Sequence, residues 1–426
     1  MEETLTLTKP HNQPKKDKSQ RPPKPKPVNP ILEALQRWQD TLPEPLLAAI
    51  LASIPNLIPT APRRWVVYPP MLLLPSGSFS SLISTAGDHA QLENSLPALW
   101  LTILEMVSKR EGKGNLTRLA INSGIPLHAA SQEEANQEQR EPGQENFMRT
   151  PSGLMMLHGD FGPPLPPTQT PSLQDLENAF WVSTKQNGLV QIWAPRYTMF
   201  SRGNIKEKAR LLDFHESGDL GCEKAAGESN GKRKHISRTV LGQHRAVDLY
   251  AGIGYFVFSY VKMGMGKVRG WEVNPWSVEG LRRGAIANGF SVRVITPDPT
   301  DQVSILKDGP EDIAIFLQDN KMALRTLQAS PERGSVLHVN CGLLPTSEPV
   351  WRDAFEMAGE EAWLHLHDNV GINDIETRRS EIETLYRSWL PGTGTGSVEV
   401  GVNLVKTFAP GVWHCVFDVY IERSNM

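Results

Sequence analysis

The 426-residue sequence has little cysteine and no long apolar run. Its three cysteines, Cys222, Cys341 and Cys415, are scattered, which excludes a disulfide framework and the paired spacing of a zinc knuckle. No apolar stretch approaches the length of a membrane span, and the lysine-containing start lacks the apolar core of a signal peptide. We therefore expect no membrane segment and a reducing, cytoplasmic location.

The sequence also lacks a charge excess, because its formal net charge at pH 7 is only -3. Any surface that binds nucleic-acid phosphates must therefore be local. With 39% hydrophobic and 21% charged residues, the composition is that of a globular protein. The length exceeds that of one ordinary core and predicts two folded units with some unstructured chain.

Composition divides the first part of the chain into segments of different character. Residues 1–27 are rich in Lys, Pro and Gln and predict a disordered tail. Residues 28–130 are expected to form a smaller N-terminal α/β domain, in which "RWVVYPPMLLLP" predicts short strands between prolines. Residues 97–125 predict apolar helices that end near Gly124. The polar residues 131–146 predict a flexible loop.

A second unit is expected over residues 147–426. In its first part, 147–214, Asn187-Gly188 between two apolar runs predicts a β-hairpin, and "NIKEKARLL" predicts a helix. Residues 215–244 are rich in Gly, Lys, Glu and Ser and predict a flexible loop. Over residues 245–426, apolar strands alternate with helical patterns, which predicts a Rossmann-like α/β core.

The segment "VDLYAGIGYF" carries the most information about function. A buried strand ends near Asp248 and turns through Gly252 and Gly254 into a helix. A dinucleotide-binding loop has a third glycine, so that a pyrophosphate reaches the helix, and this chain has Val257 there. An acidic residue before the glycines is the pattern of class I methyltransferases, whose S-adenosylmethionine carries an ammonium and no phosphate. The pattern favours S-adenosylmethionine over NAD.

Three further strands are expected to end in polar residues. "VRGWEVNP" ends at Glu272, a carboxylate able to accept hydrogen bonds from both ribose hydroxyls, and Asn274 predicts the N-cap of the next helix. "DIAIFLQDN" ends at Asp319 and Asn320, and "SVLHVNCGLLP" ends near Asn340. Open α/β sheets bind ligands at the carboxyl ends of their strands, so these residues predict one ligand cleft.

Six segments resemble, in chain order, the tRNA(Phe) 4-demethylwyosine aminocarboxypropyltransferases, the second enzymes of wybutosine synthesis. They are "FSRGNIKEKAR", "VDLYAGIGYF", "WEVNPWSVEGLRRGAIANG", "QDN", "GLLPTSE" and "HLHDNV". The likeness runs from about Phe147 to the C-terminus. It implies a class I S-adenosylmethionine-dependent, methyltransferase-like α/β domain preceded by a smaller α/β domain. It also implies transfer of the 3-amino-3-carboxypropyl group to carbon 7 of 4-demethylwyosine at position 37, with release of methylthioadenosine.

By this resemblance, S-adenosylmethionine is the co-substrate and five residues contact it. Glu272 would hold the ribose, and Asp319 with Asn320 the adenine. Ser201 and Lys208 would reach over from the preceding unit, Lys208 toward the methionine carboxylate. Spacing alone does not exclude the alternative that Lys208 is an exposed helix lysine.

The related tRNA guanosine-37 N1-methyltransferases differ at two motifs. They have F-S-P-R where this chain has "FSRG", so their catalytic arginine falls on Gly203, and their N-L-P turn is replaced by "NCGLLP". Both differences match the aminocarboxypropyl branch. Arg202, Cys341, Thr346 and Asp368 depart from that branch's commoner motifs. The alternatives are a guanosine-37 methyltransferase, a non-catalytic protein that binds S-adenosylmethionine and tRNA, and an NAD-dependent dehydrogenase.

The proton acceptor and the oligomeric state stay open. His365 and His367 share one face of the strand "AWLHLHDNV" beside Asp368; with no further ligands nearby, we expect hydrogen bonding or proton handling rather than zinc. The expected partner is the anticodon loop of tRNA(Phe), with no metal. Three aromatic residues could stack on a base of the loop, although such residues more often serve ordinary packing: Tyr255, Trp276 and Trp351. Four basic residues could meet phosphates, with solvated helix charges as the alternative: Arg202, Lys206, Arg282 and Arg283.

Overall fold

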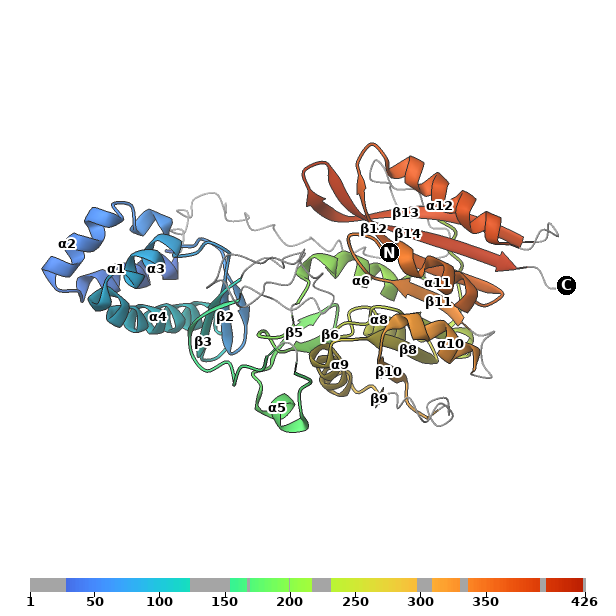
Figure 1. The fold of residues 1–426 in the computed structure, drawn as a ribbon, viewed down its shortest axis with the longest axis horizontal. Helices are drawn as coiled ribbons and strands as arrows, with labels where there is room; N and C mark the ends of the chain where they lie inside the picture. Colours follow the sequence, from blue (N-terminus) through green and yellow to red (C-terminus); the bar gives the residue numbers. More distant parts are fainter. Residues whose placement is uncertain are drawn as a thin grey trace, which may run out of the picture.

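The computed structural model describes most of the chain. The described residues are 28–122, 154–166, 169–198, 200–216, 231–296, 309–329, 336–390 and 396–423. The expected tail, 1–27, and the expected loop, 131–146, lie outside them. Along the long axis of the molecule, an N-terminal helical and sheet unit is followed by a larger α/β unit (Figure 1).

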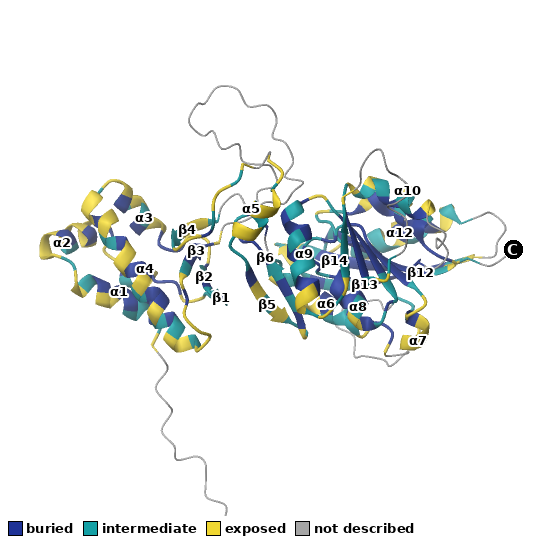
Figure 2. Cartoon of the chain, turned by 90° about the horizontal axis from the view of Figure 1, so that it is seen from below, coloured by how far each residue is buried: buried dark blue, intermediate teal, exposed yellow. Residues whose placement is uncertain are grey.

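The N-terminal unit packs helices against a four-stranded sheet of order β1-β2-β3-β4. Its elements are α1 (Pro30–Asp40), α2 (Glu44–Ser53), η2 (Ile58–Thr60), β1 (Val66–Tyr68), β2 (Met71–Leu74), α3 (Ser80–Gly87), α4 (Ala90–Glu111), β3 (Arg118–Ile121) and β4 (Met155–His158). Asn29 begins α1, because its side chain accepts a hydrogen bond from the amide of Ile31. The helices of this unit bury one side and expose the other (Figure 2), as amphipathic helices on a small core do.

The helix expected over residues 97–125 is shorter at its end. Helix α4 stops at Gly112, which adopts the left-handed conformation (φ 62°) of a helix C-cap. The prediction of a helix ending near Gly124 is therefore wrong. Residues Arg118–Ile121 form strand β3 instead, because they pair in parallel with β2 and bury their apolar side chains.

Strand β4 belongs to the N-terminal sheet, where it pairs antiparallel with β3. The boundary expected from the sequence, at residue 147, would assign β4 to the second unit and separate it from the sheet to which it belongs. We therefore propose that the N-terminal unit includes β4 and that the second unit begins after it.

A hairpin and a helix connect the two units. After α5 (Leu173–Asn178), strands β5 (Val182–Gln186) and β6 (Leu189–Trp193) pair across Asn187 and Gly188. Both turn residues have positive φ, 51° and 75°, which confirms the predicted hairpin. The short helix η3 (Arg202–Asn204) then leads into α6 (Ile205–Leu212).

The second unit is built on an eight-stranded sheet of order β13-β14-β12-β11-β7-β8-β10-β9. The strands are β7 (Arg245–Asp248), β8 (Lys267–Glu272), β9 (Val292–Ile295), β10 (Ile313–Leu317), β11 (Val336–Cys341), β12 (Glu361–Gly371), β13 (Gly396–Ala409) and β14 (Val412–Arg423). Neighbouring strands from β12 to β9 are parallel, and β14 is antiparallel to β12 and to β13. The expected Rossmann-like α/β fold is confirmed, whereas strands β9, β13 and β14 have no counterpart among the strands predicted from the sequence.

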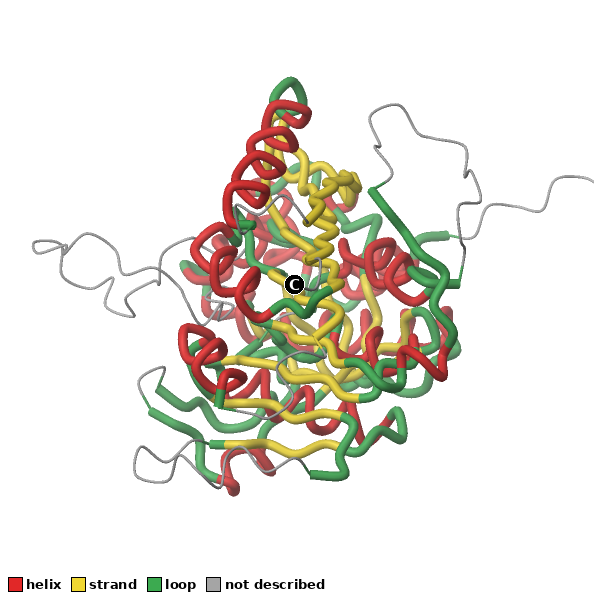
Figure 3. Tube along the Cα trace, turned by 90° about the vertical axis from the view of Figure 1, so that its right-hand side faces the viewer, coloured by secondary structure: helices red, strands yellow, loops and turns green. Residues whose placement is uncertain are grey.

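Helices cover both faces of this sheet (Figure 3). The remaining elements are α7 (Arg238–Leu241), α8 (Val257–Met263), α9 (Pro275–Ala287), η5 (Asn320–Met322), α10 (Ala323–Gln328), η7 (Glu348–Val350), α11 (Trp351–Met357) and α12 (Ile375–Trp389). One apolar core joins the sheet to α6, α8 and α9, and another joins the opposite face to α10, α11 and α12. In the described part of the chain, no helix is long and apolar enough to cross a membrane.

Residues 231–244 lie within the segment expected to be a flexible loop. They contain α7, and they pack against the sheet, where the indole nitrogen of Trp363 donates a hydrogen bond to the carbonyl of Lys232 (2.7 Å). Lys234 forms an ion pair with Glu361 (3.0 Å). Residues 217–230 lie outside the described residues.

Candidate functional site

The candidate site lies where the order of the parallel strands reverses. From β7 the chain continues to β8 on one side, and it returns later to β11 on the other, which makes the carboxyl ends of β7 and β11 a topological switch point. Asp248 ends β7 and is fully buried. Its Oδ1 accepts hydrogen bonds from the amide of Tyr250 (3.1 Å) and from Nδ2 of Asn340 on β11 (3.0 Å).

The second carboxylate oxygen of Asp248 has no hydrogen-bond partner among the described residues, although it is buried. Burial raises the pKa of Asp248 to about 7, while the hydrogen bonds from Asn340 and Tyr250 lower it and the charge of Glu272 raises it. An unpartnered carboxylate oxygen in such a place is costly unless a cation or a donor meets it. The edge of the sheet therefore suits a ligand that carries an ammonium.

The glycine loop follows β7 directly. Gly252 and Gly254 both have positive φ, 53° and 90°. A Cβ at residue 254 would lie 2.6 Å from the ring of Phe258, so no other residue fits there without movement. The amide of Gly252 donates to Oε2 of Glu272 (2.9 Å), which joins the loop to the end of β8.

Glu272 is held by two backbone amides. Besides Gly252, the amide of Asn274 donates to Oε1 of Glu272 (2.8 Å), and the side chain of Asn274 in turn caps α9 by accepting from the amide of Trp276 (3.0 Å). These bonds fix the orientation of the carboxylate at the mouth of the loop. Each oxygen still has lone-pair capacity for a hydroxyl donor.

Asp319 and Asn320 lie at the end of β10, next to β8. Asp319 caps η5 by accepting from the amide of Lys321 (2.9 Å), and its side chain is half-exposed. Nδ2 of Asn320 donates to the carbonyl of Leu249 (2.9 Å), directly after β7. The structure thus brings Asp248, the two glycines, Glu272, Asp319 and Asn320 to one edge of the sheet.

Ser201 joins this edge from the preceding segment. Its amide donates to the hydroxyl of Tyr255 in the glycine loop (2.9 Å), which places the start of η3 beside that loop. The contact continues into the N-terminal unit through packed rings: Tyr68 meets Trp193 edge-on (4.8 Å), and Trp193 stacks on Phe200 (4.7 Å).

Lys208 is buried on α6 and is not an exposed helix lysine. Its Nζ donates to the side-chain oxygens of Gln186 (2.7 Å) and Gln191 (3.1 Å) on the hairpin. The same ammonium lies over the rings of Phe200 (4.9 Å) and Tyr255 (5.3 Å). Burial lowers the pKa of Lys208 to about 8. Lys208 thus supports the hairpin, the η3 segment and the glycine loop together.

The histidines of β12 lie on one face, as strand alternation predicts, but in two separate networks. His365 is 3.0 Å from a ring nitrogen of His338 and 2.7 Å from Oδ1 of Asp418. His367 is 2.9 Å from a ring nitrogen of His414. No group of three or more His, Cys, Asp or Glu suited to a metal occurs in the described part of the chain. These histidines are hydrogen-bonded side chains of the sheet.

The residues considered for RNA contact divide into two sets. Trp276 and Trp351 are buried, and Trp276 stacks on Tyr197 (3.8 Å), so packing explains both. Arg282 and Arg283 each form an ion pair with Glu279 (2.7 Å). In contrast, Arg202 and Lys206 are exposed on η3 and α6. A further cation near η3, Lys406 of β13, carries no signal in the sequence, because only the folded sheet brings it there.

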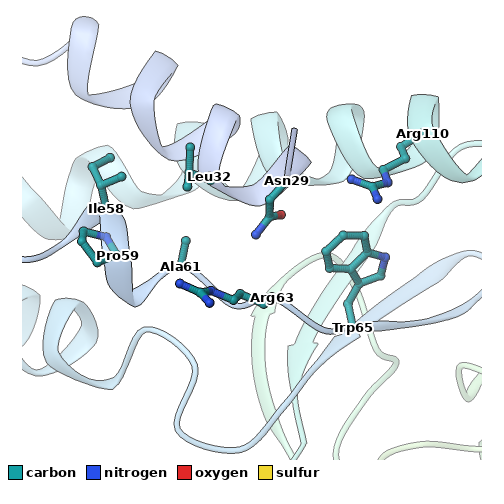
Figure 4. A pocket seen from close by; sticks show the side chains of 8 residues that line it. All are labelled: Asn29, Leu32, Ile58, Pro59, Ala61, Arg63, Trp65 and Arg110. Atoms are coloured by element: carbon teal, nitrogen blue, oxygen red, sulfur yellow. The ribbon is translucent and has the colours of Figure 1, made fainter. Parts of the chain in front are cut away.

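A pocket of about 260 Å³ lies in the N-terminal unit and not at the carboxyl edge of the sheet (Figure 4). Arg110 lies over the ring of Trp65 (5.4 Å) and donates to the carbonyl of Val28 (2.8 Å), and the indole nitrogen of Trp65 donates to Glu111 (3.1 Å). These polar groups bind one another, so we assign no ligand to the pocket.

Comparison with known proteins places the chain in a family. It is 37% identical over 360 residues to the tRNA wybutosine-synthesizing protein 2 of Schizosaccharomyces pombe, covering 84% of this chain and 72% of that protein. With the protein of the same name from Saccharomyces cerevisiae it shares 33% identity over 278 residues, 60% of this chain and 52% of that protein. No protein-family model matches the chain.

A solved structure agrees on the fold. Pyrococcus horikoshii TYW2 in complex with MeSAdo superposes with a TM-score of 0.51 at 16% identity, covering 92% of this chain and 100% of that one. The chain belongs to the tRNA wybutosine-synthesizing protein 2 family.

Proposed function

We propose that this protein transfers the 3-amino-3-carboxypropyl group of S-adenosylmethionine to carbon 7 of 4-demethylwyosine at position 37 of tRNA(Phe). Methylthioadenosine is the second product. The observation that carries the proposal is the pair of carboxylates, Asp248 and Glu272, around the glycine loop in a chain of this family. We infer that the tRNA is bound by its anticodon loop, which contains position 37, and that the enzyme acts in the cytoplasm.

The residues at the edge of the sheet fit S-adenosylmethionine. The unpartnered oxygen of Asp248 suits the ammonium of its methionine arm. Glu272, oriented by the amides of Gly252 and Asn274, suits the two ribose hydroxyls. Asp319 and Asn320 lie one strand further along, where the adenine would follow, and Ser201 closes the edge from the side of η3.

The reaction needs positioning more than a strong catalyst. The sulfonium of S-adenosylmethionine activates all three of its carbons, and the carbon turned toward the nucleophile decides which group is transferred. A carbon–carbon bond forms between carbon 7 and the arm, the arm's carbon–sulfur bond breaks, and the proton of carbon 7 leaves to an acceptor. Limiting methyl transfer to about one percent requires a barrier difference of about 2.7 kcal/mol, which the pose of the arm can supply.

Gly203 argues against the methyltransferase alternative. The guanosine-37 methyltransferases have an arginine at this position, whereas this chain has a glycine over which the flexible side chain of Lys406 lies. A non-catalytic role is not favoured either, because the acidic and glycine residues of the edge are all present and joined by hydrogen bonds.

The test is to incubate the protein with tRNA carrying 4-demethylwyosine and S-adenosylmethionine labelled in its carboxypropyl arm. We expect label in the tRNA, a base mass increased by one aminocarboxypropyl group, and methylthioadenosine in equal amount. Unmodified tRNA with guanosine at position 37 is the matched control. A methyl group on the control tRNA would instead show a guanosine methyltransferase, and binding of both substrates without transfer would show a non-catalytic protein.

A further inference from the structure

Lys406 of β13 is a half-buried cation without an acidic partner. Within the described residues it forms no ion pair, and burial lowers the pKa of its ammonium. Its side chain lies across Gly203 of η3: a Cβ at that position would meet its ammonium and lie 2.6 and 3.0 Å from its δ and ε carbons. A cation that is partly removed from water without a counter-charge is unfavourable, so this one is suited to an anionic ligand.

The backbone of β13 directs Lys406 toward η3. The pairing of β13 with β14 shifts register between Leu404 and Lys406, and again between Thr407 and Ala409. Such irregularities bend a strand and re-aim its side chains. Lys406 consequently pairs with His414 of β14, and its side chain lies across Gly203 where β13 contacts η3.

The neighbourhood of Lys406 has further features of an RNA contact. Arg202 and Lys206 are exposed on η3 and α6, beside Gly203. Phe408, two residues beyond Lys406 near the end of the hairpin, is 54% exposed. We call Arg202, Lys206, Lys406 and Phe408 the β13–η3 surface.

Acidic side chains do not oppose this surface from its own elements. Over residues 202–212 and 404–414 the only acid is Glu207. That carboxylate is buried and already bound, because it forms an ion pair with Arg210 and accepts a hydrogen bond from Asn403 (2.5 Å). Two exposed cations thus flank Gly203 along the chain, Lys406 lies across it, and the exposed Phe408 follows Lys406 by two residues. Cations combined with an aromatic ring are typical of surfaces that bind unpaired RNA.

We propose that the β13–η3 surface binds the RNA strand of the substrate tRNA, with a backbone phosphate at Lys406 over Gly203 and an unpaired base on Phe408. Arg202 and Lys206 contact neighbouring phosphates. The assignment rests on the proposed function, which makes tRNA the substrate. A single carboxylate of S-adenosylmethionine would need one cation, whereas three cations and an exposed ring suit a strand with repeated charge and bases.

The test measures equilibrium binding of tRNA(Phe) to the full chain at several salt concentrations, without S-adenosylmethionine. For Lys406→Met, we expect weaker binding and a slope of log affinity against log salt that is lower by roughly 0.7, the value for one contact to a single strand. Lys406→Arg should restore the slope. Phe408→Ala should weaken binding roughly fivefold to hundredfold with the slope unchanged, because stacking releases no counterion.

Two controls keep the result specific. Lys234 is paired with Glu361 at the start of β12, whereas Lys406 lies near the strand's end. Lys234→Met should therefore leave the salt dependence of tRNA binding unchanged. The melting temperature of Lys406→Met should be unchanged or higher, since the variant removes a half-buried charge and keeps the apolar stem.

The outcomes separate this inference from the proposed function. If Lys406→Met binds tRNA normally, or if it loses affinity for S-adenosylmethionine in a calorimetric titration while tRNA binding is unchanged, the RNA assignment is wrong. Binding is measured without turnover, so it does not depend on which group is transferred. If the unmutated protein transfers a methyl group to tRNA, and Lys406→Met still weakens tRNA binding, the proposed function is wrong but the RNA assignment of this surface holds.

Discussion

Replacement of Glu272 by alanine should weaken both the cofactor site and the fold. The residue pattern assigns Glu272 a role in cofactor binding alone, but its carboxylate accepts hydrogen bonds from the amides of Gly252 (2.9 Å) and Asn274 (2.8 Å). Glu272→Ala leaves both amides without this acceptor. The glycine loop and the start of α9 then lose their common anchor.

The magnitude follows from these two bonds. A hydrogen bond to a charged group contributes about 1.5 to 3 kcal/mol. Because Glu272 is partly exposed, water can replace one of the two contacts, and we expect the free energy of unfolding to fall by about 1.5 to 3 kcal/mol, the contribution of the other. For a unit of this size, the melting temperature should fall by roughly 3 to 12 °C. Loss of the ribose contacts should weaken S-adenosylmethionine binding at least about 100-fold.

Thermal unfolding and calorimetric titration with S-adenosylmethionine measure the two effects separately. The matched control is Asp319→Ala, which removes a half-exposed cap of η5 and should lower the melting temperature less. An unchanged melting temperature would refute the anchoring role of Glu272. An unchanged affinity would refute its role in binding the ribose.

Three further predictions concern other parts of the second unit. Gly203→Arg should impair aminocarboxypropyl transfer without creating an efficient methyltransferase, because the arginine displaces Lys406 but supplies neither a proton acceptor nor a new cofactor pose. Product masses on tRNAs with 4-demethylwyosine or with guanosine at position 37 check this, and brisk methylation of the guanosine tRNA would contradict it. Burial lowers the pKa of His367 and of His414 to about 3, so between pH 3 and about 6.5 these histidines take up protons only in the unfolded state. The free energy of unfolding should therefore fall by about 1.4 kcal/mol per pH unit for each histidine as the pH drops below 6.5. Urea unfolding at several pH values measures this slope, and a flat profile would contradict the reasoning. Arg210→Met should lower the free energy of unfolding by about 3 to 5 kcal/mol, because it removes the arginine that pairs with the buried carboxylates of Glu207 and Asp418. Chemical denaturation measures the loss, and neutralising both carboxylates in the same variant should recover most of it.

Features encoded by neighbouring residues could be predicted from the sequence. Asn187-Gly188 alone defines a hairpin turn, since few residues accept positive φ at both positions. The residues Asp248, Gly252 and Glu272 follow buried strands, and parallel strands bring their carboxyl ends to one edge whatever the details of packing. The sequence by itself thus determined the class of fold and the edge at which the ligand site lies.

Features that depend on partners far away in the chain were decided only by the tertiary structure. Strand β4 is a strand of the first sheet because β3 offers it an edge, and Lys208 is buried because the hairpin supplies two amide oxygens. Lys406 reaches Gly203 only through the register of β13 on β14. Such contacts join segments whose spacing along the chain carries no periodic signal, so they appear only once the sheet has formed and its faces are covered.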